Sequence, residues 1–106
     1  MNPRIEKLLA MHRNEPADTF VLFALAKEYQ QMGDFEKANN YFQLLKTIDP
    51  DYVGLYFHLA KNYEAINELE DAVNTYKQGI LIAKKLKDLH AESELKNELI
   101  NLELEL

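Results

Sequence analysis

The residues that could support catalysis or bind a metal are few in this chain and lie far apart. The three histidines are His12, His58 and His90, and no two of them have the close spacing of a local metal-binding pair. His90 and Glu94 are four residues apart in a predicted helix, a spacing that is far more typical of solvated surface neighbours than of metal ligands. We therefore expect no metal site.

Nucleophilic catalysis and phosphate binding also lack their usual residues. There is no cysteine, Ser93 is the only serine, and three scattered glycines cannot form a phosphate-binding loop. The acidic stretch Glu68–Asp71 opens a predicted helix, where acids stabilise the helix dipole, whereas a calcium loop needs a turning backbone with a glycine. We predict no catalytic residue and no cofactor, so the protein is not expected to be an enzyme.

Composition and charge narrow the function further. Hydrophobic residues make up 47% of the 106 residues and charged residues 28%, which favours a folded helical protein. The net charge is −6, and an acidic chain without a basic stripe is a poor ligand for nucleic acids. The opening MNPRIEKLLAMHRNEP is too interrupted by charge for a signal peptide, and no apolar run could cross a membrane. We expect a cytoplasmic protein that binds neither nucleic acid nor membrane.

The elements that must position any functional side chain come from an internal repeat of 34 residues. Aligned without a gap, residues 19–52 and 53–86 share nine identical positions. The identical pairs are Phe23/Phe57, Leu25/Leu59, Ala26/Ala60, Lys27/Lys61, Tyr29/Tyr63, Glu36/Glu70, Ala38/Ala72, Asn40/Asn74 and Ile48/Ile82. A period of this length indicates stacked units, each of which cannot bury its apolar face alone.

Each unit has the pattern of a helical hairpin, because its apolar residues recur at three- and four-residue steps on both sides of a short turn. In the first unit, Gly33 can end one helix in the left-handed conformation and Asp34 can cap the next. In the second unit, Asn67 precedes Glu70 by three residues, which predicts a capping box with Asn67 as the cap.

The order of small, aromatic and turn residues resembles the tetratricopeptide repeat, a family with the same 34-residue period. The matching residues are Leu25, Ala26, Tyr29, Gly33, Phe35, Ala38, Phe42 and Pro50 in the first copy, and Leu59, Ala60, Tyr63, Leu69, Ala72 and Tyr76 in the second. The second copy departs from the family at Asn67, at Gly79 and at Lys84, which stands where the terminal proline is usual. Without that proline, we expect the second helix of this copy to continue to about Lys87.

The flanking segments complete the predicted organisation. Residues 3–14 read as a half-repeat helix, with Asn2 as its cap and Pro3 at its first position, and residues 88–104 read as a capping helix. We predict a single domain of residues 1–106 and an all-α fold of about six helices. The resemblance implies an α-solenoid of antiparallel hairpins, a right-handed superhelix.

The resemblance also implies a concave groove, lined by the first helices of successive hairpins, that takes extended or helical peptides. Carried over by alignment, the groove positions are Phe20, Phe23, Ala24, Lys27, Gln30, Gln31, Phe57, His58, Lys61 and Glu64. Another aromatic set falls at the family's positions between helices, and we expect it to be core: Tyr29, Tyr41, Phe42, Tyr63 and Tyr76.

Two duplicated pairs, Phe23 with Lys27 and Phe57 with Lys61, should lie side by side on neighbouring helices. One interpretation is a two-part binding patch, in which the rings accept an apolar side chain and the lysines attract a carboxylate. The alternative is that both rings pack against neighbouring helices and both lysines are solvated.

Some proteins of this family clamp the C-terminal carboxylate of chaperones with Lys, Asn and Arg side chains from three units. Here Phe23 stands where that clamp has its first Lys, Lys27 stands where it has Asn, and no third unit is complete, so a more apolar ligand is expected. The predicted function is a non-catalytic scaffold that binds a peptide or a partner protein. The alternative is a self-assembly unit, since the ends of helical repeats expose apolar surface that a second copy could cover in a homodimer.

Overall fold

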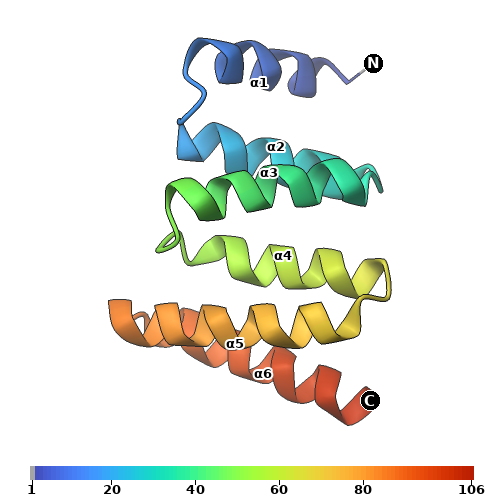
Figure 1. Ribbon diagram of the computed structural model, residues 1–106, viewed down its shortest axis with the longest axis vertical. Coiled ribbons are helices and arrows are strands. Elements are labelled where there is room, and N and C mark those ends of the chain that lie inside the picture. The colour runs from blue at the N-terminus through green and yellow to red at the C-terminus, as the bar shows by residue number, and fades with distance from the viewer. Residues whose placement is uncertain (1) are drawn as a thin grey trace. The chain divides into compact units, whose positions relative to one another are not determined.

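The computed structural model describes residues 2–106 and contains six helices within them, with no strand (Figure 1). The fold is therefore all-α, as the periodicity predicts. The chain divides into two compact units, unit 1 of residues 1–50 and unit 2 of residues 51–106.

Unit 1 contains α1 (Pro3–Asn14), α2 (Thr19–Gln31) and α3 (Phe35–Ile48). In this unit α2 packs against α3 as a hairpin, and α1 packs against α2. The buried apolar side chains of the unit's core are Ile5, Leu8, Val21, Leu22, Leu25, Ala26, Tyr29, Ala38, Phe42 and Leu45. They recur at helical spacing, so each helix turns one apolar stripe inward.

Short polar caps fix where these helices begin. The side chain of Asn2 accepts hydrogen bonds from the backbone N–H groups of Arg4 and Ile5, and Pro3 occupies the first turn. Asp34 caps α3 through the N–H of Lys37. Gly33 has φ of 81°, the left-handed conformation that ends α2.

Unit 2 contains α4 (Gly54–Ala65), α5 (Leu69–Leu86) and α6 (Leu89–Glu105). α5 packs against both α4 and α6. The core is made by Leu55, Tyr56, Leu59, Ala60, Ala72, Tyr76, Ile80, Ala83, Leu95 and Leu102. As expected from the missing proline, α5 is longer than α3, with 18 residues against 14, and Lys87 ends it with φ of 58°.

The predicted capping role of Asn67 is wrong. Asn67 has φ of 61°, and the residue before α5 is Glu68, whose side chain makes no capping hydrogen bond. Asn67 instead takes the place that Gly33 has in unit 1, where a left-handed residue closes the preceding helix. Asparagine tolerates this conformation better than most residues do, which explains why the turn forms without glycine.

Candidate functional site

Five of the predicted groove residues lie together on the exposed side of α2. They line a hollow of about 250 Å³ with two further residues, and the full lining is Arg4, Phe20, Phe23, Ala24, Lys27, Glu28 and Gln31. Phe20 is 65% exposed, so an apolar surface is open to solvent at this point. Gln30 is half-buried in α2 and does not line the hollow.

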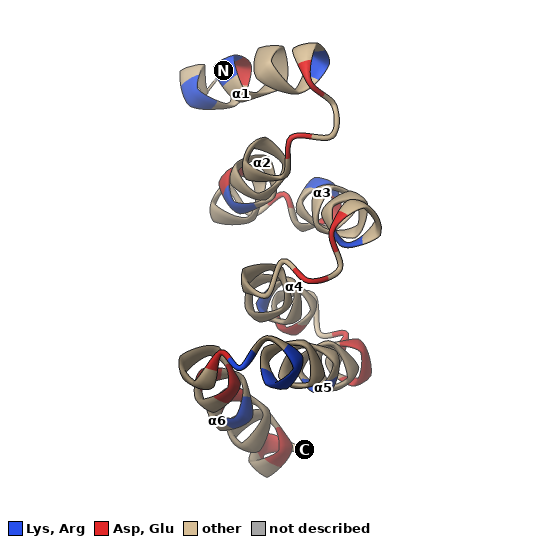
Figure 2. Ribbon diagram, turned by 90° about the vertical axis from the view of Figure 1, so that its left-hand side faces the viewer, with Lys and Arg blue, Asp and Glu red and all other residues tan. Residues whose placement is uncertain are grey.

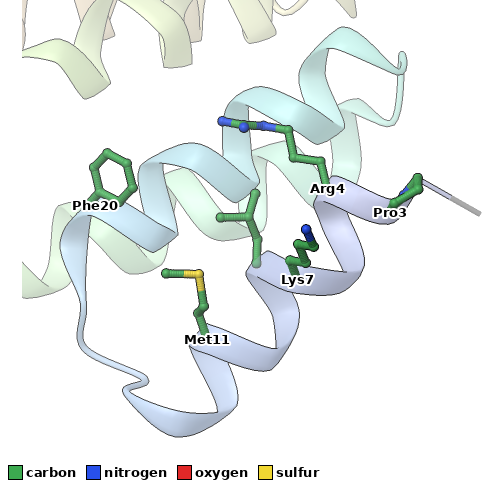
Figure 3. Close-up of a pocket in the computed structure, with 6 residues that line it drawn as sticks. Pro3, Arg4, Lys7, Met11 and Phe20 are labelled. Atoms are coloured by element: carbon green, nitrogen blue, oxygen red, sulfur yellow. The ribbon is translucent and has the colours of Figure 1, made fainter.

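A second hollow of about 410 Å³ lies between α1 and α2 (Figure 3). Its lining residues are Pro3, Arg4, Lys7, Leu8, Met11 and Phe20. Both hollows include Arg4 and Phe20, so they form one continuous surface, which we call the α1–α2 groove. Figure 3 shows Arg4, Lys7 and Met11 extending from α1 beside Phe20 of α2.

The α1–α2 groove combines aromatic rings with positive charge. Arg4 is paired with Glu28, with its Nε 2.5 Å from the carboxylate. The Nζ of Lys27 lies 5.4 Å from the centre of the Phe23 ring, close enough for a cation–π contact. Within residues 2–106, neither Lys7 nor Lys27 has a carboxylate within ion-pair distance.

Phe23 has a packing role as well. Its ring meets the buried ring of Phe42 edge-on, with centroids 6.5 Å apart, and Phe23 is only partly exposed. Phe20 is the more accessible of the two phenylalanines on α2. The apolar contact surface of the groove therefore depends more on Phe20 and Met11, which is 47% exposed, than on Phe23.

The corresponding residues of α4 are arranged differently, because α6 contacts them. The Nζ of Lys61 lies 5.7 Å from the centre of the Phe57 ring, which repeats the pairing seen on α2. The same Nζ is 2.5 Å from the carboxylate of Glu98 on α6 and 3.7 Å from that of Glu64. The charge of Lys61 is thus already neutralised inside unit 2.

A hydrogen-bonded network extends from this lysine into the core of unit 2. The buried hydroxyl of Tyr76 donates to the carboxylate of Glu64, which also contacts Lys61. Burial, the hydrogen bond to Glu64 and the nearby negative charges raise the pKa of Tyr76 well above its ordinary value. Burial lowers the pKa of Lys61, but its hydrogen bond to Glu98 and the charges of Glu64 and Glu98 outweigh this and leave that pKa raised. The network ties α4, α5 and α6 together.

The remaining predicted positions have local contacts. His58 packs edge-on against Phe57, with ring centroids 5.2 Å apart. Phe23 and Lys27 belong to unit 1, and Phe57 and Lys61 to unit 2, so the predicted alignment of the two pairs stays a prediction.

The contribution of α1 to the groove was not predicted from the sequence. Arg4, Lys7 and Met11 recur at three- and four-residue steps, so they share a face of α1, and this signal was available in the sequence. Glu98 was not predicted either, and its contact with Lys61 joins residues 37 positions apart. Local periodicity cannot show a contact over that distance in sequence.

Residues 2–106 have neither the features of a metal site nor those of a membrane-spanning helix. No cluster of three or more His, Asp and Glu side chains in this range has the arrangement of a metal site. None of the helices formed by these residues is both long enough and apolar enough to span a bilayer.

Comparison with known proteins agrees with the repeat and with the helix arrangement. Family models described as tetratricopeptide repeat match residues 21–51 and residues 53–91. The TPR repeat-containing protein PA0015 of Pseudomonas aeruginosa is 33% identical over 92 residues, which are 86% of this chain and 84% of that protein. The chain belongs to the tetratricopeptide repeat family. Repeats of this family typically serve as non-catalytic interaction modules.

A second relative is much longer than this chain. The TPR repeat-containing protein YpiA of Bacillus subtilis is 34% identical over 76 residues, which are 72% of this chain. The match spans 18% of the length of YpiA.

Solved structures of other tetratricopeptide repeat domains have the same fold. A domain from Salinibacter ruber is 38% identical with a TM-score of 0.79, and the match covers 84% of this chain and 90% of that one. The TPR2B domain of yeast Sti1 has a TM-score of 0.89 at 16% identity, with 96% of this chain and 82% of that chain covered. The likeness to Sti1 shows the fold alone.

Proposed function

We propose that this protein is a non-catalytic scaffold and that its α1–α2 groove binds a short segment of a partner protein. The segment would place an apolar side chain against Phe20 and Met11 and a carboxylate near Lys7 or Lys27. The observation that carries the proposal is the presence of two lysines without an ion-pair partner in residues 2–106 beside an exposed aromatic ring.

The chemistry of the groove favours this ligand. Burying a large apolar side chain such as Phe20 stabilises a complex by about 1.5–3 kcal/mol, before the costs of association. Lysine binds a carboxylate as a flexible point charge and needs no bidentate geometry. An apolar and acidic segment would satisfy both parts of the groove at once.

The two units differ in what they offer to a ligand. Lys61 is paired with Glu98 and Glu64, so an incoming carboxylate would have to replace existing contacts. Lys27 has no such competitor among the described residues. We therefore assign the principal binding surface to unit 1 and expect Phe57, His58, Lys61 and Glu64 to contribute less.

A structural neighbour supports peptide binding by this fold. The TPR2B domain of Sti1 is described in complex with pHsp70. The fold of this chain is thus compatible with the binding of another polypeptide.

Affinity capture from a lysate of the source organism tests the proposal. We expect proteins captured by the wild type to be lost with a Lys7→Glu, Lys27→Glu double variant. Lys37→Glu is the matched control. The Nζ of Lys37 also lies 5.4 Å from the centre of an aromatic ring, that of Tyr29, but Lys37 lines a different hollow. Partners that survive the double variant, or that disappear equally with Lys37→Glu, would contradict the assignment to the α1–α2 groove.

A further inference from the structure

We propose that the α1–α2 groove of one copy of this chain binds the last two turns of α6 of a second copy. The inference rests on the proposed function, because it names an occupant for the same groove. It makes the protein self-associating whenever no other partner fills that surface.

The last part of α6 has the chemistry that the groove favours. Its apolar side chains are open to solvent, with Ile100 54% exposed, Leu104 80% and Leu106 68%. Glu103 and Glu105 are exposed between them. The segment therefore alternates apolar surface with carboxylates.

These two carboxylates differ from the others on α6. Glu92 is 2.6 Å from Lys96, Glu94 is 3.5 Å from His90, and Glu98 is 2.5 Å from Lys61. Glu103 and Glu105 have no ion-pair partner within residues 2–106. The unpaired negative charge of α6 is thus concentrated where its apolar side chains are most exposed.

The groove and this segment are complementary in charge and in polarity. The groove offers Lys7 and Lys27 without carboxylate partners, and the segment offers two carboxylates without cationic partners. Figure 2 shows basic residues on α1 and acidic residues in the last part of α6. Opposite charges across such an interface set the register and speed the encounter.

Another exposed apolar residue of unit 2 fits the groove poorly. Leu81 on α5 is 66% exposed, but the nearby exposed residues of the same helix include Lys77, Lys84 and Lys85. Lys85 is paired with Asp51, but Lys77 and Lys84 have no carboxylate partner within residues 2–106 and would be repelled by the cationic groove. The charge pattern therefore selects α6 over α5.

Docking would not require α6 to unfold. Leu95 and Leu102 are each 2% exposed and hold α6 in unit 2, whereas Ile100 and Leu104 are exposed. The segment can bind as a formed helix, which avoids the entropy cost of ordering a flexible chain. Each copy would offer one groove and one α6, and such a heterologous contact builds rings or open chains.

Mixing two variants tests the contact. Variant G carries Lys7→Glu and Lys27→Glu, and variant T carries Glu103→Lys and Glu105→Lys. In light scattering at low salt, we expect the mass of the wild type to rise with concentration and each variant alone to stay monomeric. An equimolar mixture should associate again, because the groove of each variant is then complementary in charge to α6 of the other variant.

A chain with all four substitutions should associate again, because both charges are reversed together. Circular dichroism would confirm that each variant keeps its helices. A wild type that stays monomeric over the whole concentration range, or a mixture of G and T that forms no dimer, would overturn the inference.

Engineered cysteines locate the contact, since the natural chain contains none. A Met11→Cys copy mixed with a Leu104→Cys copy should form a disulfide-linked dimer under mild oxidation. Leu81→Cys is the control, as its position is exposed but on α5. Equal cross-linking of Met11→Cys to both positions would contradict docking by α6.

The outcomes separate this inference from the proposed function. Variant T has an intact groove, so it should still capture an outside partner even though it cannot bind a second copy. Capture by variant T with a monomeric wild type would reject self-docking and leave the proposed function standing. Self-association without any outside partner captured would reject an outside ligand and support self-docking.

Discussion

At the scale of single residues, Tyr76 and Gly79 of α5 lie where α4, α5 and α6 of unit 2 pack together. The hydroxyl of Tyr76 donates to Glu64, which with Glu98 contacts Lys61. Gly79 lies on α5 where Tyr56 of α4 and Leu95 of α6 approach closely. Each residue gives a stability prediction.

Replacing Tyr76 by Phe should lower the free energy of unfolding at neutral pH by about 1.5 kcal/mol, the lower end for a hydrogen bond to a charged group. The pKa of Tyr76 is raised in the folded state, first by burial and then by Glu64. The contribution of the Tyr76 hydroxyl to the free energy of unfolding is therefore fully present below the unfolded pKa of about 10 and is lost as the pH rises further.

Urea unfolding between pH 7 and pH 11 would measure both effects. The wild type should lose stability above about pH 10 more steeply than Tyr76→Phe. Tyr41→Phe should cost less at neutral pH, because no carboxylate in residues 2–106 bonds to the Tyr41 hydroxyl. Parallel alkaline profiles for the wild type and Tyr76→Phe would show that the network does not carry the pH dependence.

Replacing Gly79 by Ala should destabilise the protein by about 1–2 kcal/mol, because overpacking exceeds the gain in helix propensity. An added Cβ would lie 2.6 Å from the Cβ of Tyr56 and 3.0 Å from a methyl carbon of Leu95. Lys77→Ala, an exposed change on the same helix, should shift the urea midpoint little. A Gly79→Ala variant more stable than the wild type would refute the close approach of the three helices.

At the scale of elements, the sequence pattern predicts the helices well because their signals are local. The three- and four-residue steps between apolar side chains, the Asn2 and Asp34 caps and the Gly33 turn all depend on residues within a few positions of one another. The role of Asn67 could not be predicted in this way, because asparagine favours both helix caps and the left-handed conformation. Only the backbone conformation distinguishes these two roles.

The end of α5 gives a prediction at this scale. Lys87 has φ of 58°, a conformation that costs a residue with a Cβ about 1–2 kcal/mol relative to glycine. Lys87→Gly should therefore raise the free energy of unfolding by about 1 kcal/mol. Lys77→Gly, inside the same helix, should lower it by a similar amount.

Thermal melting of the two glycine variants compares these opposite effects under one condition. A Lys87→Gly variant that melts below the wild type would mean that α5 does not end in the left-handed conformation at Lys87.

At the scale of the whole molecule, the sequence predicts the family and part of the site. Alignment with the repeat places Phe20, Phe23, Lys27 and Gln31 on one face of α2, and the structure shows them lining one hollow. The contribution of α1 depends on contacts such as that of Arg4 with Glu28, which are 24 positions apart. The spacing of Arg4, Lys7 and Met11 places them on one face of α1, but which helix that face meets follows from tertiary packing and leaves no pattern in a short window.

Tertiary packing also explains why Lys61 is ion-paired and Lys27 is not paired within residues 2–106. The two lysines occupy equivalent repeat positions, yet within residues 2–106 Lys61 has the carboxylate of Glu98 as a partner and Lys27 has no ion-pair partner. Identical residues in the two repeats are therefore not equally available to a ligand, because different side chains surround them.

Selection from a library of displayed 12-residue peptides, followed by fluorescence anisotropy on the selected sequences, tests most directly whether the α1–α2 groove binds apolar and acidic segments. We expect the selected peptides to carry Leu or Phe beside Asp or Glu. Their affinity should fall at least about tenfold with Lys7→Glu, Lys27→Glu, a loss of about 1.4 kcal/mol, and should be unchanged with Lys37→Glu. Selected peptides that are basic, or that bind the double variant as tightly as the wild type, would contradict the account.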